Sequence, residues 1–251
     1  MAQDFLKELI SPGQKSNISF EESLLWKYSE LARLSYKDGD IPGYEELVVD
    51  EHDRIIGKRD GQEVWLGFRG SGADSAHWLG KTGNLHALPN NDSICRGFAN
   101  ALQEFHDGLK SWCQGSRIIH LTGHSRGGAF ATLGGWLLAN DFRDAEVNVV
   151  VFGCPRVGTS TFAEKFRNRK NLRWAGFQHA GDHVGKLPPW GEHIHPPADP
   201  LTDFQAGSWP LLQRIPKVGN ALNIMWVFGS NLMMLTGKSK FEAVCPSVIC
   251  V

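Results

Sequence analysis

Apolar residues recur at helical spacing between Glu21 and Tyr36, and the pattern stops at Asp38-Gly39-Asp40. This stretch predicts an amphipathic helix whose apolar face is formed by Leu24, Leu25, Tyr28, Leu31 and Ala32. Two short β-prone runs follow at residues 54–58 and 63–68. They are joined by a segment that contains Asp60-Gly61, and Asp-Gly is a strong signal for a tight hairpin turn. We therefore expect a helix followed by a pair of hydrogen-bonded strands.

From residue 98 onward the chain alternates between helical and strand-like patterns. The predicted elements are a helix at 98–112, a strand at 117–121, a helix at 127–138, a strand at 146–152, a helix at 161–166 and a strand at 172–177. Apolar strands without a polar alternation, separated by helices, are typical of a parallel sheet that is covered on both faces. We therefore predict one α/β domain over residues 1–251. Beyond Pro188 the chain is rich in Pro, His and Trp, and the pattern there is weaker, with a buried helix favoured only within residues 221–235.

Composition and charge narrow the range of functions. The 251 residues include 26 basic and 27 acidic side chains, and this balance gives no electrostatic footprint for nucleic acid or an anionic membrane. The five cysteines are widely spaced and lack a CxxC pair, so neither a disulfide framework nor a metal knuckle is expected. The first residues lack the apolar core of a signal peptide, which favours a cytoplasmic location, although a processed secreted chain would look the same. The apolar stretch 221–235 is too short and too polar to span a bilayer.

The strongest chemical signal is Gly123-His124-Ser125-Arg126-Gly127, which lies between a predicted strand and a predicted helix. In such a Gly-x-Ser-x-Gly turn the serine adopts a strained conformation, and the two glycines let neighbouring backbone pass. The serine hydroxyl is then exposed at the carboxyl edge of the sheet. The N-terminus of the following helix is directed at the position where an oxyanion would form. The pattern predicts a nucleophilic serine, Ser125.

The same segment resembles the serine elbow of the fungal-type, or class 3, triacylglycerol lipases, with Arg126 in place of their usual leucine. Further segments resemble that family in the same order, and together they cover roughly residues 25–195: Tyr28 to Tyr36; Phe68-Arg69-Gly70-Ser71 with Trp78, Asn84 and Leu85; Arg96-Gly97-Phe98; Phe152 to Gly158; and Asp182 to Pro189. The resemblance implies a single α/β-hydrolase domain with a mostly parallel central sheet, helices on both faces and a lid.

Ester cleavage requires a nucleophile, a base, a group that orients the base and two donors for the oxyanion. Ser125 is the predicted nucleophile, and the backbone N–H of Arg126, the residue that follows it, is the predicted first oxyanion donor. The resemblance makes Ser71 the second donor and Asp182 the carboxylate that orients the base. Asp182 follows the strand 172–177, so it is expected at the same sheet edge as Ser125. Asp203 is the alternative candidate for this carboxylate.

The resemblance fails at the catalytic base. The family places its catalytic histidine near the C-terminus, before a short apolar-aromatic segment that ends in glycine, and the similar segment here begins with Asn223. No histidine follows His195. Asparagine does not titrate, so it cannot accept the serine proton. Three explanations are open: His195 or His193 acts as the base instead, the base has been lost, or the alignment of the C-terminal segment is wrong. His183 is disfavoured as the base because it adjoins Asp182. We take His195 as the base.

These residues predict a serine hydrolase that cleaves carboxylic esters of acylglycerol lipids through an acyl-enzyme on Ser125, without a metal or organic cofactor. A phospholipase A1 would use the same machinery. A catalytically impaired lipase-like protein that binds a lipid or a protein partner is the alternative from a different class. Residues 71–85 mix apolar residues and glycines and resemble the lipase lid, so transient contact with a lipid interface is expected there.

Overall fold

The protein is described here by a computed structural model that covers residues 22–49, 53–71, 85–87, 93–179, 184–186, 193–194 and 202–204. Its centre is a seven-stranded sheet with the order β1-β2-β3-β6-β7-β9-β11. The strands are β1 Glu45–Val49, β2 Arg54–Asp60, β3 Glu63–Phe68, β6 Ile118–His124, β7 Glu146–Phe152, β9 Leu172–His179 and β11 Thr202–Phe204. The pairs β1–β2 and β2–β3 are antiparallel, and every later pair is parallel. This mixed, mostly parallel sheet confirms the predicted fold class.

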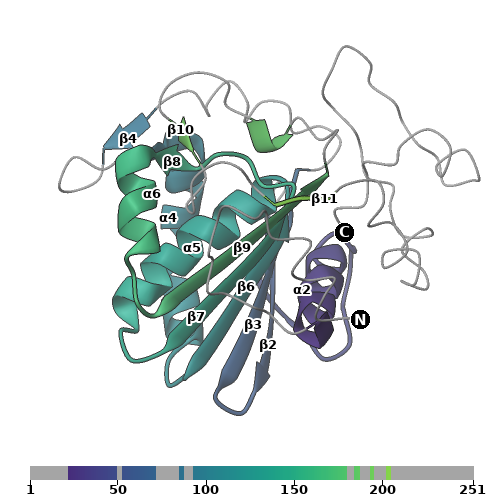
Figure 1. Ribbon diagram of the computed structural model, residues 1–251. Helices are drawn as coiled ribbons and strands as arrows, with labels where there is room; N and C mark the ends of the chain where they lie inside the picture. Colours follow the sequence, from purple (N-terminus) through teal and green to yellow (C-terminus); the bar gives the residue numbers. More distant parts are fainter. Residues whose placement is uncertain are drawn as a thin grey trace, which may run out of the picture.

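Helices cover both faces of the sheet, as the apolar strands predict (Figure 1). The helix α2, Glu22–Leu34, packs on one face, mainly against β6 and β3. On the other face lie α4, Arg96–Trp112, and α5, Arg126–Asp141, with α6, Ser160–Arg167, beside α5. In β6 and β7 nearly every side chain is buried, since each strand has a helix-covered layer on both sides.

The predicted hairpin between β2 and β3 is present. Asp60 pairs with Glu63, which leaves Gly61 and Gln62 as the two turn residues. Gly61 has a φ of +60°, a conformation that glycine adopts without steric cost and that two-residue hairpin turns demand. The turn fixes the register of β3, and therefore the point at which the chain leaves β3 after Phe68.

A second sheet of four very short strands has the order β10-β8-β5-β4. Its strands are β4 Leu85–Ala87, β5 Ser93–Cys95, β8 Gly158–Thr159 and β10 His193–Ile194, and a turn of 3-10 helix spans Val184–Lys186. The sequence did not predict this sheet, because strands of two or three residues carry too little periodicity to be recognised.

The core is divided by the central sheet into two clusters. The larger lies between the sheet and α4 and α5, and it contains edge-to-face aromatic contacts of Phe130 with Phe98 and Phe105. The smaller lies under α2, around Tyr28, Trp65 and Phe152. Cys95, Cys113 and Cys154 are buried, and none of the three is in a disulfide. Among the described residues, no helix is both long and apolar enough to cross a bilayer.

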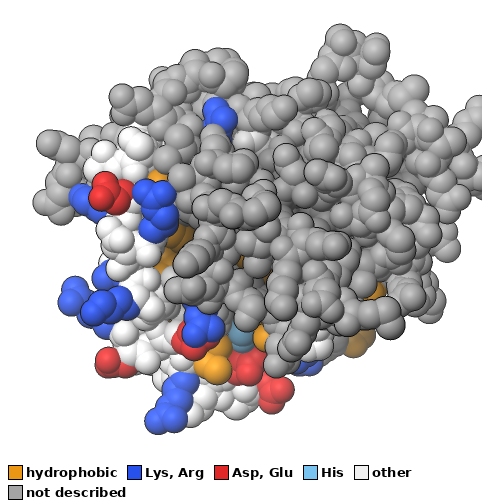
Figure 2. Space-filling view, in the orientation of Figure 1, with side chains coloured by type: hydrophobic (Ala, Val, Ile, Leu, Met, Phe, Trp, Pro, Cys, Tyr) orange, Lys and Arg blue, Asp and Glu red, His pale blue; other side chains and the backbone are white. Residues whose placement is uncertain are grey.

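The described surface seen in Figure 2 carries basic and acidic side chains side by side. No patch of a single sign dominates the described part of this face, in keeping with a net charge of -1.

Candidate active site

Ser125 occupies the sharp turn between β6 and α5. Its backbone has φ 55° and ψ -127°, and it is the only non-glycine residue in the described ranges with a positive φ. Such a conformation costs a non-glycine residue of order 1–3 kcal/mol and persists only where the surroundings enforce it. Its N–H donates to the carbonyl of Phe152 at the end of β7, over 2.9 Å. The predicted elbow is therefore present, and Ser125 is held in it.

Two glycines make the elbow sterically feasible. A Cβ on Gly123 would lie 2.3 Å from the carbonyl oxygen of Gly127, and a Cβ on Gly127 would lie 2.1 Å from the carbonyl oxygen of Phe68. Both obstructing atoms are backbone, so neither can move aside as a side chain could. The helix α5, the turn and the end of β3 therefore approach one another as closely as backbone allows.

This packing predicts opposite effects for two glycines of α5. Gly127→Ala is expected to lower the free energy of unfolding by about 3 kcal/mol, because the added methyl group overlaps backbone. Gly134→Ala is the matched control: a Cβ there would lie 3.5 Å from a Leu121 methyl group, an ordinary contact. Alanine is also the better helix former, so this variant should gain up to about 1 kcal/mol. Urea denaturation measures the free energy of unfolding of both variants. Equal changes in the two variants would contradict a steric conflict at Gly127.

The hydroxyl of Ser125 is not consumed by capping α5. Ser125 is the N-cap residue, yet its side chain makes no capping hydrogen bond, and the residue is half-buried. Its carbonyl oxygen accepts the Gly128 N–H over 2.9 Å, which starts the helix. The first N–H groups of a helix, here beginning with Arg126, have no partner within the helix and carry the positive end of its dipole. A negative oxygen beside Ser125 would therefore face an electropositive helix terminus.

The loop after β3 forms a second wall beside the elbow. Phe68 pairs with Gly123 across β3 and β6, and a Cβ on Gly70 would lie 2.5 Å from the His124 carbonyl oxygen. This loop delivers Ser71, whose hydroxyl oxygen is buried and has no hydrogen-bond partner within the described part of the chain. A buried polar group without a partner carries a desolvation cost, and that cost is recovered if a ligand atom binds there.

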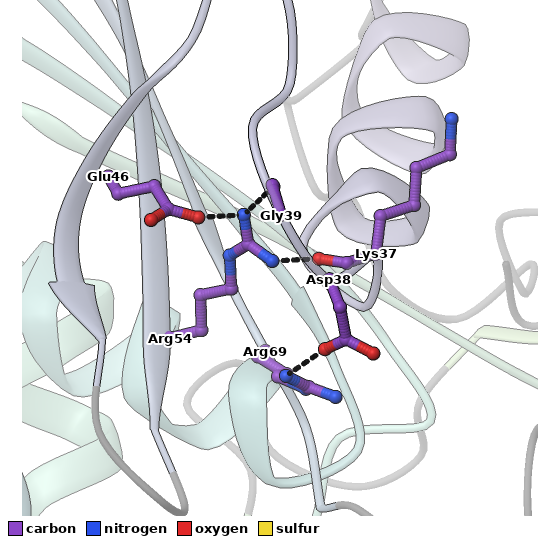
Figure 3. Close-up of polar contacts among 6 residues, drawn as sticks. All are labelled: Lys37, Asp38, Gly39, Glu46, Arg54 and Arg69. Carbon is purple, nitrogen blue, oxygen red and sulfur yellow. Dashed lines mark hydrogen bonds and ion pairs between the residues drawn. The ribbon is translucent and has the colours of Figure 1, made fainter.

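Two arginines hold this loop and the turn after α2 together (Figure 3). Arg54, which is buried, donates to the carbonyl oxygens of Lys37 and Gly39 and pairs with Glu46. Arg69 pairs with Asp38 at 3.1 Å, and its backbone N–H donates to the Arg54 carbonyl at 2.9 Å. These contacts of Arg54 and Arg69 help to fix the position of the loop that carries Ser71.

The side chain of Arg126 adds a feature that the sequence did not predict. Its guanidinium is buried, pairs with Asp53 at 2.6 Å and lies over the ring of Phe130. The side-chain exposures of the two partners are only 5% and 13%, so removing either one would leave a buried charge. The residue whose backbone N–H is the predicted oxyanion donor is therefore also fixed through its side chain.

His124, immediately before the nucleophile, is a packing residue whose ring lies against that of Tyr36. Burial lowers its pKa to about 4, so it is neutral at pH 7, and its Nδ1 lies 2.9 Å from the hydroxyl oxygen of Tyr36. The role of Tyr36 was not foreseen, because the two residues are 88 positions apart.

The remaining predicted residues lie wholly or partly outside the described ranges. Asp182, His183, His195 and Asn223 are not described, nor are residues 72–84 of the predicted lid. Of His193 and Asp203 only the backbone is described, in β10 and β11. The register of the sheet does place Phe177 of β9 level with Phe152, which is level with His124. The chain therefore leaves β9 at the sheet edge where Ser125 lies.

Comparison with known proteins agrees with this geometry. Residues 66–192, just over half of the chain, match the sequence model of the family described as lipase (class 3). The fold is similar to that of the triacylglyceride lipase of Rhizomucor miehei, with a TM-score of 0.60 and 20% identity over 71% of this chain and 78% of that one. Lipase II from Rhizopus niveus gives 0.58 and 18% over 69% and 77%. The lipase from Rhizopus microsporus var. chinensis gives 0.56 and 17% over 74% and 78%. At these identities the structures establish a shared fold.

Proposed function

Because the chain belongs to the class 3 lipase family and is a carboxylic ester hydrolase of the lipase type, we propose that it cleaves acylglycerol esters through an acyl-enzyme on Ser125. The observation that carries this proposal is the conformation of Ser125, a non-glycine residue held at φ 55° on a strand-to-helix turn, whose hydroxyl is not used to cap α5. The choice of acylglycerols is supported by the fold shared with a triacylglyceride lipase.

In the proposed reaction the Ser125 hydroxyl oxygen attacks the ester carbonyl carbon while its proton passes to the imidazole base. The carbonyl oxygen becomes an oxyanion, held by the Arg126 backbone N–H and by Ser71 through its N–H and hydroxyl. The tetrahedral intermediate then expels the alcohol, which takes the proton from the imidazolium, and leaves an acyl group on Ser125. Water repeats the sequence and releases the acid. Asp182 is proposed to orient the imidazole and stabilise its charged form.

His195 is proposed as the base, with His193 as its nearest competitor. Two substitutions separate this assignment from a lost base. If His195 is the base, His195→Ala should lower kcat by at least about 10³-fold, and Asn223→His should not increase it. Steady-state hydrolysis of a p-nitrophenyl ester measures both. An unchanged rate in His195→Ala together with an increase of orders of magnitude in Asn223→His would instead identify position 223 as a disabled base slot.

The enzymatic proposal is tested with a fluorophosphonate probe and a series of esters. The protein should react with the probe and hydrolyse p-nitrophenyl esters, and it should release fatty acid from triacylglycerol faster than from phosphatidylcholine vesicles. The reverse order of these lipids would indicate a phospholipase A1. Rates that rise sharply when the ester exceeds its solubility limit would support contact of residues 71–85 with a lipid interface.

A catalytically silent, lipid-binding protein remains the second candidate, and one observation favours it: the chain has no histidine after His195. That candidate predicts neither labelling by the probe nor hydrolysis of any ester, while lipid still binds. Binding without chemistry would therefore replace the enzymatic proposal.

A further inference from the structure

Alternate residues of β6 form a row of polar side chains beneath α2. His120 and Thr122 are partnered by Tyr28 of that helix, and His124 is partnered by Tyr36 in the turn that follows it. The Tyr28 hydroxyl lies 2.5 Å from Nδ1 of His120, and the Thr122 hydroxyl donates to the Tyr28 carbonyl over 3.3 Å. The Tyr36 hydroxyl lies 2.9 Å from Nδ1 of His124. The face thus carries two equivalent tyrosine–histidine contacts.

The spacing of the two contacts follows from the geometry of the elements. The tyrosines are eight residues apart and the histidines four apart. Eight residues of helix rise about 12 Å, and four residues of strand span about 13 Å. Tyr36 lies just beyond the end of α2, but the turn that carries it keeps helix-like hydrogen bonds, from Ser35 N–H to Leu31 and from Tyr36 N–H to Arg33. The rise of the helix between the two tyrosines therefore matches the distance along β6 between the two histidines.

Only the Tyr36 contact touches the candidate active site. The Tyr36 hydroxyl oxygen lies directly against Gly70, since a Cβ on Gly70 would lie 1.9 Å from it. Gly70 adjoins Ser71, and His124 adjoins Ser125. One phenolic oxygen therefore connects the two backbone segments that carry the proposed oxyanion donors.

The protonation states of these groups are well defined. Burial, opposed by the positive charges of Arg126 and Arg69, raises the pKa of Tyr36 above its ordinary value, so the phenol is neutral. Burial lowers the pKa of His124 to about 4, so the imidazole is also neutral. The Tyr36 hydroxyl oxygen lies 2.9 Å from Nδ1 of His124 and 3.4 Å from its carbonyl oxygen, so it can bond His124 in either tautomer of the imidazole.

We propose that Tyr36 is a positioning residue that sets the separation between the two halves of the oxyanion hole. The inference rests on the proposed function of Ser125. An oxyanion hole is effective only when its donors are preorganised around the position of the developing negative charge, and small displacements are costly. Loss of the phenol oxygen removes the group that both packs against Gly70 and hydrogen-bonds His124. The two donors then drift relative to each other without leaving the site.

The test compares Tyr36→Phe with Tyr28→Phe. Each variant removes one tyrosine hydroxyl that contacts a histidine of β6, so each should lower the melting temperature. Tyr36→Phe is expected to lower kcat for a p-nitrophenyl ester by about tenfold to hundredfold, with KM changed less than about twofold. Affinity for an alkyl boronic acid, which forms a tetrahedral adduct on serine, should fall in parallel. Tyr28→Phe should retain kcat within about twofold of the parent protein.

Equal kcat values for the two tyrosine variants would overturn the inference. If Tyr36→Phe does not fold, His124→Leu and His124→Asn decide the question with Tyr36 in place. Asparagine keeps an acceptor near the position of Nδ1, whereas leucine has none. His124→Asn should retain at least about five times the kcat of His124→Leu, and equal kcat values would again overturn the inference. A parent protein that neither reacts with a fluorophosphonate nor hydrolyses esters would instead refute the proposed function, and this inference with it.

Discussion

Replacing Ser125 by alanine is expected to lower kcat for ester hydrolysis by about 10⁴-fold or more. Without the hydroxyl no acyl-enzyme forms, and water must attack the ester directly. The oxyanion donors and the binding site remain, so a residual acceleration over water of about 10³ to 10⁴ is still expected. KM should change little, because Ser125 is proposed to act on the transition state rather than on ground-state binding. The effect is measured by comparing the initial rates at which the two proteins hydrolyse a p-nitrophenyl ester. Active-site titration gives the concentration of active parent protein.

The matched control is Ser111→Ala, at an exposed position of α4. Its rate should equal that of the parent protein. Ser125→Ala should also fold as well as the parent, since the Ser125 side chain makes no capping hydrogen bond to α5. A Ser125→Ala variant that keeps a tenth or more of the parent rate would exclude Ser125 as the nucleophile.

Acid is expected to destabilise the protein through the two histidines beneath α2, by about 4 kcal/mol between pH 7 and pH 5. Burial lowers the pKa values of His120 and His124 to about 4, from an ordinary 6.5. As the pH falls below 6.5 the unfolded chain therefore binds protons that the folded chain does not, and the free energy of unfolding decreases. Each pKa unit corresponds to about 1.4 kcal/mol.

The two histidines should contribute about equally, since the pKa of each is lowered to about 4. His124 has only the neutral Tyr36 as its described side-chain hydrogen-bond partner. Urea denaturation at pH 7 and pH 5 measures the loss, and His124→Asn, which does not titrate, should reduce it by about 2 kcal/mol. An equal loss in this variant would show that His124 does not carry the effect.

The features that the sequence predicts are those encoded over short distances. The helix α5 and strands β6 and β7 follow from continuous apolar runs, and the hairpin follows from Asp60-Gly61. The small second sheet could not be found in this way, because β5 pairs Ile94 with Gly158 across 64 positions and each strand is two or three residues long. Such strands exist because distant segments meet, and no local pattern marks them.

Within the site, too, the features encoded over short distances were predicted and those made by distant segments were not. The elbow was predictable because the steric demands of Gly123 and Gly127 act on neighbours in the chain as well as on β3. The buried pair of Arg126 with Asp53 was not, since an arginine after the serine gives no indication of its partner. Nor was the bridge made by Tyr36, because a tyrosine at the end of an amphipathic helix is equally compatible with simple packing.

The proposed hydrolysis proceeds through acyl transfer to the serine of the elbow, and the most direct test is to trap that intermediate. The protein is mixed with p-nitrophenyl butyrate, quenched in acid within the first turnover, digested, and its peptides are weighed by mass spectrometry. We predict that the peptide containing Ser125 gains the mass of one butyryl group, that fragmentation locates it on Ser125, and that the gain disappears as substrate is exhausted. Turnover with Ser125 unmodified at every quench time, or a butyryl group on a different residue that appears and decays at the rate of turnover, would contradict the account.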